Sequence, residues 1–313
     1  MEKPRVFITR RLALDPASVL GKGIEIDVHD SELAPERSDL LRRTREASAL
    51  LPILADRIDA EVIEGSPRLR IVANHAVGTD NVDVEACTRR GIWVTNTPGV
   101  LTDSTADMTW ALILALARRL REGERMLRAG EYRGWAPTIL LGRELREKTL
   151  GILGYGRIGR AVARRAEGFG MRVLFTARGG GVPLDELLQE SDVLSIHCPL
   201  TPDTHHLIGP AELLRMKRGA LLVNTARGPI VDEAALVAAL EARHLGGAAL
   251  DVFEHEPAVH AGLVKRDDVV LLPHLGSATV ETRQEMARLA LSQVELVLRG
   301  ERPTHPVNEV AAP

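Results

Sequence analysis

The stretch from Thr149 to Gly159 constrains the fold of this chain more than any other. It reads T-L-G-I-L-G-Y-G-R-I-G, in which an apolar run predicts a buried parallel strand and the glycines follow as G-x-G-x-x-G. A G-x-G-x-x-G is weak by itself, but here apolar residues at helical spacing follow it, and a second apolar strand is predicted at Val173 to Phe175. Such a turn lets a pyrophosphate approach the backbone at the positive end of the helix. The stretch therefore predicts a dinucleotide-binding α/β domain.

The composition is that of an ordinary globular protein of about two domains, with 313 residues, 45% hydrophobic and 27% charged. A net charge of −3 gives no reason to expect nucleic acid or an anionic membrane as a partner. The longest unbroken apolar run, Trp110 to Ala117, is too short for a membrane span, and the N-terminus has no signal-peptide pattern. Cys87 and Cys198 lack metal or redox spacing, so neither a disulfide nor a metal site is expected. These features predict a cytoplasmic location.

The order of the predicted elements indicates two Rossmann-like domains with doubly wound parallel sheets. The chain crosses between them at Thr97-Pro98-Gly99, and a last helix is expected to return to the first domain and make it discontinuous. We therefore predict a substrate-binding domain from 1–99 plus 283–313 and a dinucleotide-binding domain from 100–282. The predicted strands are Arg5–Thr9, Glu25–His29, Ala49–Pro52, Leu69–Asn74, Trp93–Thr95, Thr149–Leu153, Arg172–Thr176, Val193–His197, Ala220–Asn224, Ala248–Asp251 and Val269–Leu272. The predicted helices include Glu36–Arg43, Asp59–Glu64, Val84–Arg90, Thr102–Arg118 and Thr279–Arg299.

The predicted helix Thr102–Arg118 is unusual because its middle, W-A-L-I-L-A-L-A, is apolar on nearly every face. Such a helix should be buried all round, with its own sheet covering one side and a second subunit the other. The loop from Gly130 to Gly142, which contains Tyr132 and Trp135, is expected to lie beside it.

Three predicted strand ends in the second domain carry polar residues suited to chemistry. They read N-T-A-R-G, D-V-F-E-H-E-P and P-H-L-G-S, and place Arg227, Glu256 and His274 where parallel strands bind their ligands. Arg227 would hold a carboxylate and polarise the neighbouring carbonyl, and His274 would protonate its oxygen as hydride arrives. Glu256 would hydrogen-bond the imidazole and keep it protonated near neutral pH. Singly, each has a plainer explanation as an ion pair, a turn residue or a solvated loop, but all three on one nucleotide-binding sheet point to an active site.

These stretches resemble the D-2-hydroxyacid dehydrogenase family, and within it most closely the glyoxylate/hydroxypyruvate reductases. The matching segments are A-V-G-T-D-N-V-D (76–83), V-T-N-T-P-G-V-L-T-D-S-T-A-D (94–107), G-Y-G-R-I-G (154–159), N-T-A-R-G (224–228), D-V-F-E-H-E-P (251–257) and P-H-L-G-S-A (273–278). The resemblance implies that Arg227, Glu256 and His274 form the catalytic triad. It also implies that the backbone N–H groups of Val77 and Gly78 bind the substrate carboxylate, with Arg227 and His274 completing the substrate site. A homodimer formed through the nucleotide domains is implied as well.

The resemblance and the glycine motif together give a set of expected cofactor contacts, including Thr105 and Asp251 near the nicotinamide. The full set is Thr105, Gly154, Tyr155, Gly156, Arg157, Ile158, Gly159, Ala177, Arg178, Pro199, Thr204, Thr225, Ala226, Arg227, Asp251, His274 and Gly276.

The residues after the second strand of the nucleotide domain depart from the family pattern. Ala177 stands where relatives that prefer NAD keep an aspartate that bonds the ribose 2′-OH, and Arg178 follows it. We therefore predict NADP as the preferred cofactor, with NAD possible. The next residues, G-G-G-V-P-L-D, make a shorter connection than the family has, so a strand is expected to be missing on the adenine side.

The substrate is expected to be a small 2-keto acid, glyoxylate or hydroxypyruvate, reduced to the D-2-hydroxy acid. Phosphoglycerate dehydrogenases of the family keep a basic residue at the pocket mouth, where this chain has Ile53 and Leu54. Formate dehydrogenases carry an amide where Glu256 stands. Two alternatives stay open: another D-2-hydroxyacid dehydrogenase of the phosphoglycerate type, or an NAD(H)-sensing corepressor that keeps the triad, although the Ser/Pro-rich tail of such proteins is not seen.

Overall fold

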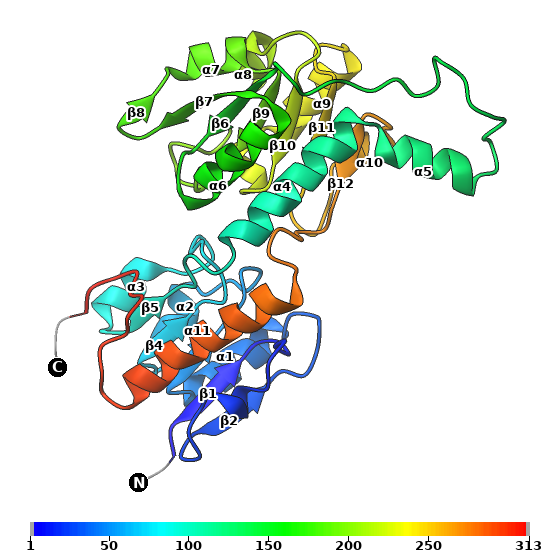
Figure 1. Ribbon diagram of the computed structural model, residues 1–313. Coiled ribbons are helices and arrows are strands. Elements are labelled where there is room, and N and C mark those ends of the chain that lie inside the picture. The colour runs from blue at the N-terminus through cyan, green and yellow to red at the C-terminus, as the bar shows by residue number, and fades with distance from the viewer. Residues whose placement is uncertain (1–2, 311–313) are drawn as a thin grey trace. The chain divides into compact units, whose positions relative to one another are not determined.

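The computed structural model describes residues 3–310, which form two compact units. Unit 1 contains the chain up to Leu101 and again from Ala278, and unit 2 runs from Thr102 to Ser277. The chain therefore crosses between the units two residues after the first predicted boundary and five residues before the second. Each unit contains one sheet, as Figure 1 shows.

Unit 1 is built on a five-stranded parallel sheet with the order β2-β1-β3-β4-β5. Its strands are β1 (Arg5–Ile8), β2 (Glu25–Val28), β3 (Ala49–Leu51), β4 (Ile71–Ala73) and β5 (Trp93–Thr95). Its helices are α1 (Arg37–Glu46), α2 (Ala60–Glu64), α3 (Val84–Arg89) and α11 (Val280–Leu298). Residues of β1 alternate between two cores: Phe7 packs with α1, α2 and α3, whereas Val6 and Ile8 pack with α11. The returning helix α11 thus covers one face of the sheet, which makes this unit discontinuous.

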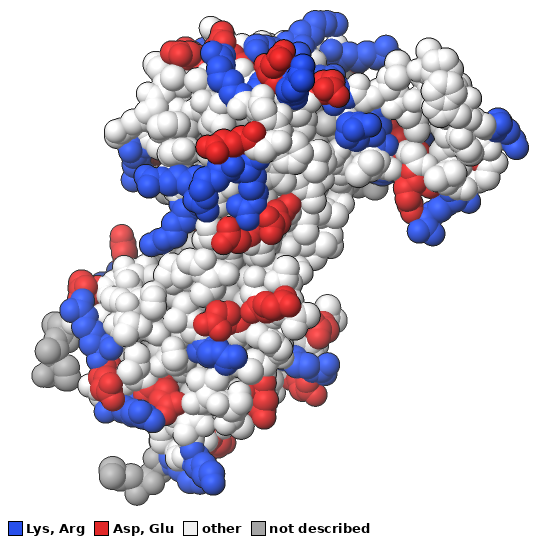
Figure 2. Space-filling view, in the orientation of Figure 1, with Lys and Arg blue, Asp and Glu red and all other residues white. Residues whose placement is uncertain are grey.

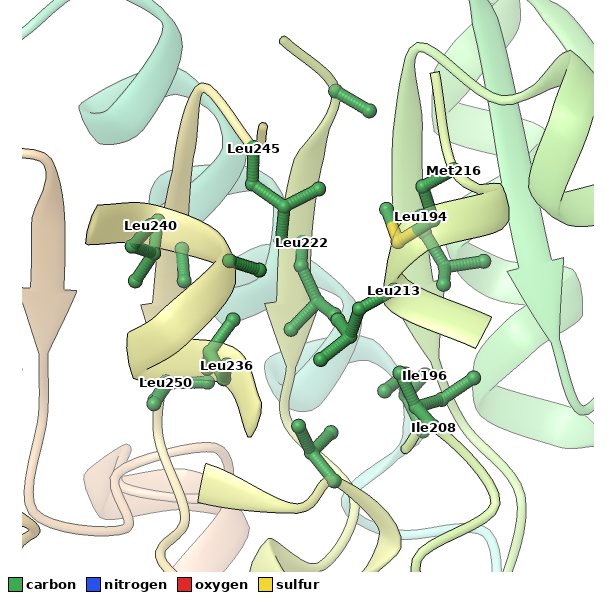
Figure 3. Packing of buried hydrophobic residues seen from close by; sticks show 14 of the residues in the cluster. Leu194, Ile196, Ile208, Leu213, Met216, Leu222, Leu236, Leu240, Leu245 and Leu250 are labelled. Carbon is green, nitrogen blue, oxygen red and sulfur yellow. The ribbon is translucent and has the colours of Figure 1, made fainter. Parts of the chain in front are cut away.

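Unit 2 is built on a seven-stranded sheet with the order β12-β11-β10-β9-β6-β7-β8, in which only β8 is antiparallel. Its strands are β6 (Thr149–Leu153), β7 (Arg172–Ala177), β8 (Gly180–Gly181), β9 (Val193–Ile196), β10 (Leu221–Asn224), β11 (Gly247–Leu250) and β12 (Val269–Leu271). Its helices are α4 (Thr102–Ala117), α5 (Leu120–Arg128), α6 (Arg157–Ala166), α7 (Leu184–Glu190), α8 (Pro210–Arg215), α9 (Glu233–Glu241) and α10 (Ala261–Val264). Helices α4 and α6 cover one face, and α7 to α10 cover the other. Figure 3 shows the core on the side of α7 to α10, where Leu222 of β10 lies among side chains of α8 and α9.

Helix α4 is not covered on every face by its own chain, and the predicted cover by a second subunit stays a prediction. Trp110, Leu112 and Ile113 are buried, but Asp107 and Ala111 lie one turn apart on an exposed stripe. Within one chain, the sheet and α6 pack against the buried residues of the helix.

The segment after α4 also differs from the prediction. Arg119 takes a left-handed conformation with φ of 54°, which breaks the helix, and the unpredicted helix α5 begins at the next residue. The following loop lies beside α4 only where it returns, because Arg143 N–H donates to the carbonyl of Ala117. Its middle extends away from the sheet in Figure 1, and 80% of Trp135 is exposed.

A search of the described residues finds no helix with the length and apolar character that a membrane crossing requires.

Candidate active site

The turn between β6 and α6 has the geometry that a dinucleotide pyrophosphate needs. Gly154 has φ of 99°, and a Cβ there would lie 2.4 Å from the Cys198 nitrogen, while one at Gly159 would lie 2.2 Å from the Gly154 oxygen. A Cβ at Gly156 would meet nothing within 4 Å. Two glycines therefore allow close backbone packing, and the third leaves open space at the start of α6, where the first-turn amides point outward. Among the expected contacts here, Arg157 is exposed and Tyr155 and Ile158 are half-buried.

Exposed arginines lie along α6, from its first turn to its last. Arg157, Arg160 and Arg164 are exposed on α6, and Figure 2 shows this basic band. Arg160 lies 5.5 Å from the ring of Tyr155, which itself stacks on Phe175 of β7. An anionic cofactor fits the charge of this edge.

The edge of the sheet expected to face the adenine contains little regular structure beyond β7. The strand expected to be missing is replaced by β8, a two-residue strand that pairs antiparallel with Thr176 and Ala177. The side chain of Arg178 is 87% exposed, with a carboxylate oxygen of Asp203 at 3.8 Å. Asp203 belongs to the loop after β9, in which Thr204 Oγ1 donates to the carbonyl of Pro199 at 2.7 Å. The structure therefore brings Arg178 to the same edge as that loop.

The end of β10 places Arg227. Asn224 holds the turn with both ends of its amide: its Oδ1 accepts from Ala226 N–H at 3.0 Å, and its Nδ2 donates to the Arg227 carbonyl at 2.8 Å. The guanidinium of Arg227 donates to the Ala226 carbonyl at 2.8 Å. Gly228 must be glycine here, because a Cβ would lie 1.9 Å from the Phe253 carbonyl carbon. The loops after β10 and β11 are thus packed directly on each other.

Glu256 and His274 form a hydrogen-bonded pair. His274 Nδ1 lies 3.0 Å from Glu256 Oε2, and Glu256 Oε1 accepts from Phe253 N–H at 3.1 Å. Burial opposes ionisation of Glu256, but the hydrogen bond and charge of His274, the Phe253 N–H and the charge of Arg227 together outweigh it, so the pKa of Glu256 is lowered. The side chains of Glu256 and His274 are 33% and 22% exposed, which leaves the pair accessible to a ligand.

His274 sits on a backbone that Asp251 holds in place. His274 has φ of 57°, an uncommon conformation for a residue with a side chain, and its N–H donates to the Asp251 carbonyl at 2.9 Å. The Asp251 carboxylate accepts from Leu275 N–H at 2.6 Å and from Gly276 N–H at 2.7 Å. Burial raises the pKa of Asp251, although these two bonds oppose the effect. The Asp251 side chain therefore fixes the turn that carries His274.

A buried hydroxyl chain connects this turn to α4 and β10. Thr109 Oγ1 donates to the Thr105 carbonyl at 2.8 Å and lies 2.9 Å from Thr225 Oγ1. A Cβ at Gly276 would lie 3.4 Å from the Thr105 methyl carbon. The structure thus brings Thr105, Thr225, Asp251 and Gly276 together, as expected for neighbours in one site.

One interaction in this region was not predicted from the sequence. Glu254 Oε1 lies 2.7 Å from His206 Nε2. Its N–H donates to Glu233 Oε1 at 2.8 Å, and its Oε2 accepts from Glu233 N–H at 3.3 Å. Glu233 is 5% exposed. These contacts connect the loops after β9 and β11 to the first residue of α9. The three residues are far apart along the chain, so no sequence motif could have predicted that they meet.

In unit 1, Val77 and Gly78 lie in the loop after β4. Asn96 Nδ2 donates to the Val77 carbonyl and Asn74 Nδ2 to the Gly78 carbonyl, each at 2.8 Å. Ile53 and Leu54, in the loop after β3, are both half-buried. The nearest charged residues along the chain are paired: Asp56 bonds the buried Arg10 at 3.0 Å, and the exposed Arg57 bonds Asp59 at 3.1 Å. In the part of the chain that is described, no group of His, Cys, Asp or Glu could hold a metal ion.

The fold and this arrangement define a dehydrogenase of the two-domain α/β type, and comparison with known proteins specifies which. Residues 110–276 match the family described as D-isomer specific 2-hydroxyacid dehydrogenase, NAD binding domain. The chain belongs to this family.

Individual relatives match this chain over almost its whole length. A curated glyoxylate reductase of Thermococcus litoralis is 46% identical, with 98% of this chain and 97% of the relative covered. A crystal structure of a Thermus thermophilus protein has a TM-score of 0.92 at 47% identity, covering 97% of this chain and all of its own. An NADPH-dependent glyoxylate/hydroxypyruvate reductase of Sinorhizobium meliloti, solved with NADP and malonate, has a TM-score of 0.85 at 34% identity and covers 97% of each chain.

Proposed function

We propose that this protein transfers a hydride from NAD(P)H to a small 2-keto acid, glyoxylate or hydroxypyruvate, and releases the D-2-hydroxy acid. The observation that carries the proposal is the Glu256–His274 pair at the carboxyl end of the sheet that also bears the dinucleotide turn. The names of the relatives support the same chemistry: glyoxylate reductase for the Thermococcus litoralis protein and glyoxylate/hydroxypyruvate reductase for the Sinorhizobium meliloti protein.

The roles of the site residues in this proposal follow from the hydrogen bonds described above. Bound NAD(P)H supplies the hydride to the carbonyl carbon. Glu256 occupies Nδ1 of His274, so Nε2 is the nitrogen left to donate a proton to the carbonyl oxygen. Arg227 holds the substrate carboxylate and polarises the carbonyl, since its planar fork matches that geometry. The remaining expected cofactor contacts, from Gly154 to Gly159 and at Thr105, Pro199, Thr204, Thr225, Ala226 and Gly276, would orient the dinucleotide.

The preferred cofactor in this proposal is NADP. No carboxylate follows β7 directly, and the exposed guanidinium of Arg178 is available to a 2′-phosphate. The Sinorhizobium meliloti relative, whose structure holds NADP, supports this choice. We also place the protein in the cytoplasm, where its free cysteines, Cys87 and Cys198, would stay reduced.

The proposed assembly is a homodimer. Large apolar side chains are exposed after α4: Leu120 is 55% and Leu127 64% exposed on α5, and Trp135 is 80% exposed in the following loop. Apolar surface of this extent favours association. Sedimentation at micromolar concentration should show a dimer, and a monomer under those conditions would contradict the assignment.

A substrate panel tests the whole proposal. Purified protein should oxidise NADPH with glyoxylate and hydroxypyruvate, and should act poorly on a phosphorylated keto acid because Ile53 and Leu54 provide no charge for a phosphate. Preference for the phosphorylated substrate would favour the phosphoglycerate-type alternative. Dinucleotide binding without turnover of any keto acid would favour the corepressor.

A further inference from the structure

The loop after β4 in unit 1 has an unusual pattern of backbone hydrogen bonds. Three consecutive carbonyls are held from the end of the sheet: Ala76 O accepts from Thr97 N–H at 2.9 Å, Val77 O from Asn96 Nδ2 at 2.8 Å and Gly78 O from Asn74 Nδ2 at 2.8 Å. By contrast, the amides of Val77, Gly78 and Thr79 donate to no other group within residues 3–310. All three residues are half-exposed.

This pattern has a direct geometric consequence. In a planar trans peptide the C=O and N–H point in opposite directions. Holding the Val77 carbonyl therefore aims the Gly78 N–H away from Asn96, and holding the Gly78 carbonyl aims the Thr79 N–H away from Asn74. Consecutive amides turned outward in this way suit an anion.

The two asparagines are themselves held firmly. They are the first residues after the paired strands β4 and β5, and Asn74 N–H continues the ladder by donating to the Thr95 carbonyl at 2.9 Å. Asn74, which is fully buried, exchanges hydrogen bonds with Asn81 at 2.9 and 3.1 Å. Asn81 also donates to the Ile53 carbonyl at 3.0 Å. The network thus connects the amide loop to the loop that carries Ile53.

We infer that Asn74 and Asn96 are positioning residues that hold the Val77–Thr79 loop with its amides outward, so that these amides receive the substrate carboxylate. The inference rests on the proposed function and deepens it: it assigns the Thr79 amide to the binding loop and gives two side chains the task of orienting it. Neither asparagine needs to touch the substrate.

The test compares Asn96→Ala and Asn74→Ala with Asn308→Ala. Asn308 is a matched control, because it is buried in the same unit and holds β5 through Val94 N–H, but has no bond to the loop. Oxalate binding by calorimetry and the KM for glyoxylate are measured, together with the KM for NADPH and thermal unfolding. Each loop variant should bind oxalate about tenfold more weakly and show a similar rise in the glyoxylate KM, the effect of losing one well-placed charge-assisted bond. The NADPH KM should not change.

Several results would overturn the inference. Folded loop variants with wild-type oxalate binding would do so, and so would an equal loss in Asn308→Ala. Asn96 is only half-buried, so Asn96→Ala keeps the test available if Asn74→Ala does not fold. Oxalate binding needs no turnover. A wild type that binds oxalate but does not reduce glyoxylate would therefore refute the proposed function while the inference is still tested.

Discussion

The carboxyl end of the unit 2 sheet is built in two different ways on its two sides. Over β10, β11 and β12, Asn224, Asp251 and Glu256 each accept hydrogen bonds from backbone amides and hold the turns that bear the reactive side chains. Beside β7 and β8, Arg178 is 87% exposed and its nearest carboxylate is 3.8 Å away. Proton transfer requires fixed geometry, whereas discrimination between cofactors can rest on a single surface charge. Substitutions on the first side should therefore affect catalysis, and those on the second only cofactor choice.

The largest effect is expected from His274→Ala. Loss of the proton donor should lower kcat by about 10²- to 10⁴-fold, the usual contribution of general acid catalysis. NADPH binding, followed by its fluorescence, should be nearly unchanged, which separates lost chemistry from lost binding. Retained turnover would show that another group supplies the proton.

Arg227→Lys is expected to come next. Lysine keeps the charge but not the planar fork, and a charge-assisted hydrogen bond contributes roughly 1.5–3 kcal/mol. The value of kcat/KM for glyoxylate should therefore fall by at least about tenfold. Steady-state kinetics equal to wild type would remove Arg227 from the site.

Arg178→Ala tests the side of the sheet beside β7 and β8. The KM for NADPH should rise by about tenfold, at the low end for one charge-assisted bond because the side chain is 87% exposed and screened. The KM for NADH and the turnover at saturating cofactor should barely change. Arg172→Ala is a matched control, since Arg172 is 57% exposed at the opposite end of β7 and pairs with Glu190. Equal loss with both cofactors, or a wild type that uses NADH as well as NADPH, would refute the assignment.

Glu256→Gln should have the smallest effect and the most specific one. The pKa of Glu256 is lowered, so it is a carboxylate throughout the neutral range and accepts the hydrogen bond from His274 Nδ1. Glutamine removes the negative charge beside the imidazole and weakens the hydrogen bond to Nδ1, so kcat/KM for glyoxylate should fall by roughly threefold and should depend differently on pH. An unchanged pH profile of kcat/KM would show that the two residues are not coupled.

The sequence predicted the sheets of both units because apolar runs end at polar or glycine residues where the strands end. It also predicted Arg227, Glu256 and His274 to share one edge, since the parallel arrangement brings strand ends together. Helix α5 was missed, because L-R-E-G-E-R-M-L-R is short and largely charged, buries none of its side chains within the chain and contains a glycine. The Glu254–His206 contact was missed for a related reason: only the folded sheet brings these loops together. The side of α4 that its own chain covers depends on where α6 packs, and amino-acid composition does not predict that position.

The Arg227, Glu256 and His274 side chains of unit 2 are expected to take part in reduction of a keto acid, so that the protein does more than bind a dinucleotide. The most direct measurement follows NADPH consumption and glycolate formation together, in wild type and in His274→Ala. We predict one glycolate for each NADPH oxidised by the wild type, and turnover close to background in the variant with NADPH still bound. A wild type that binds NADPH but leaves glyoxylate and hydroxypyruvate unreduced would contradict the claim.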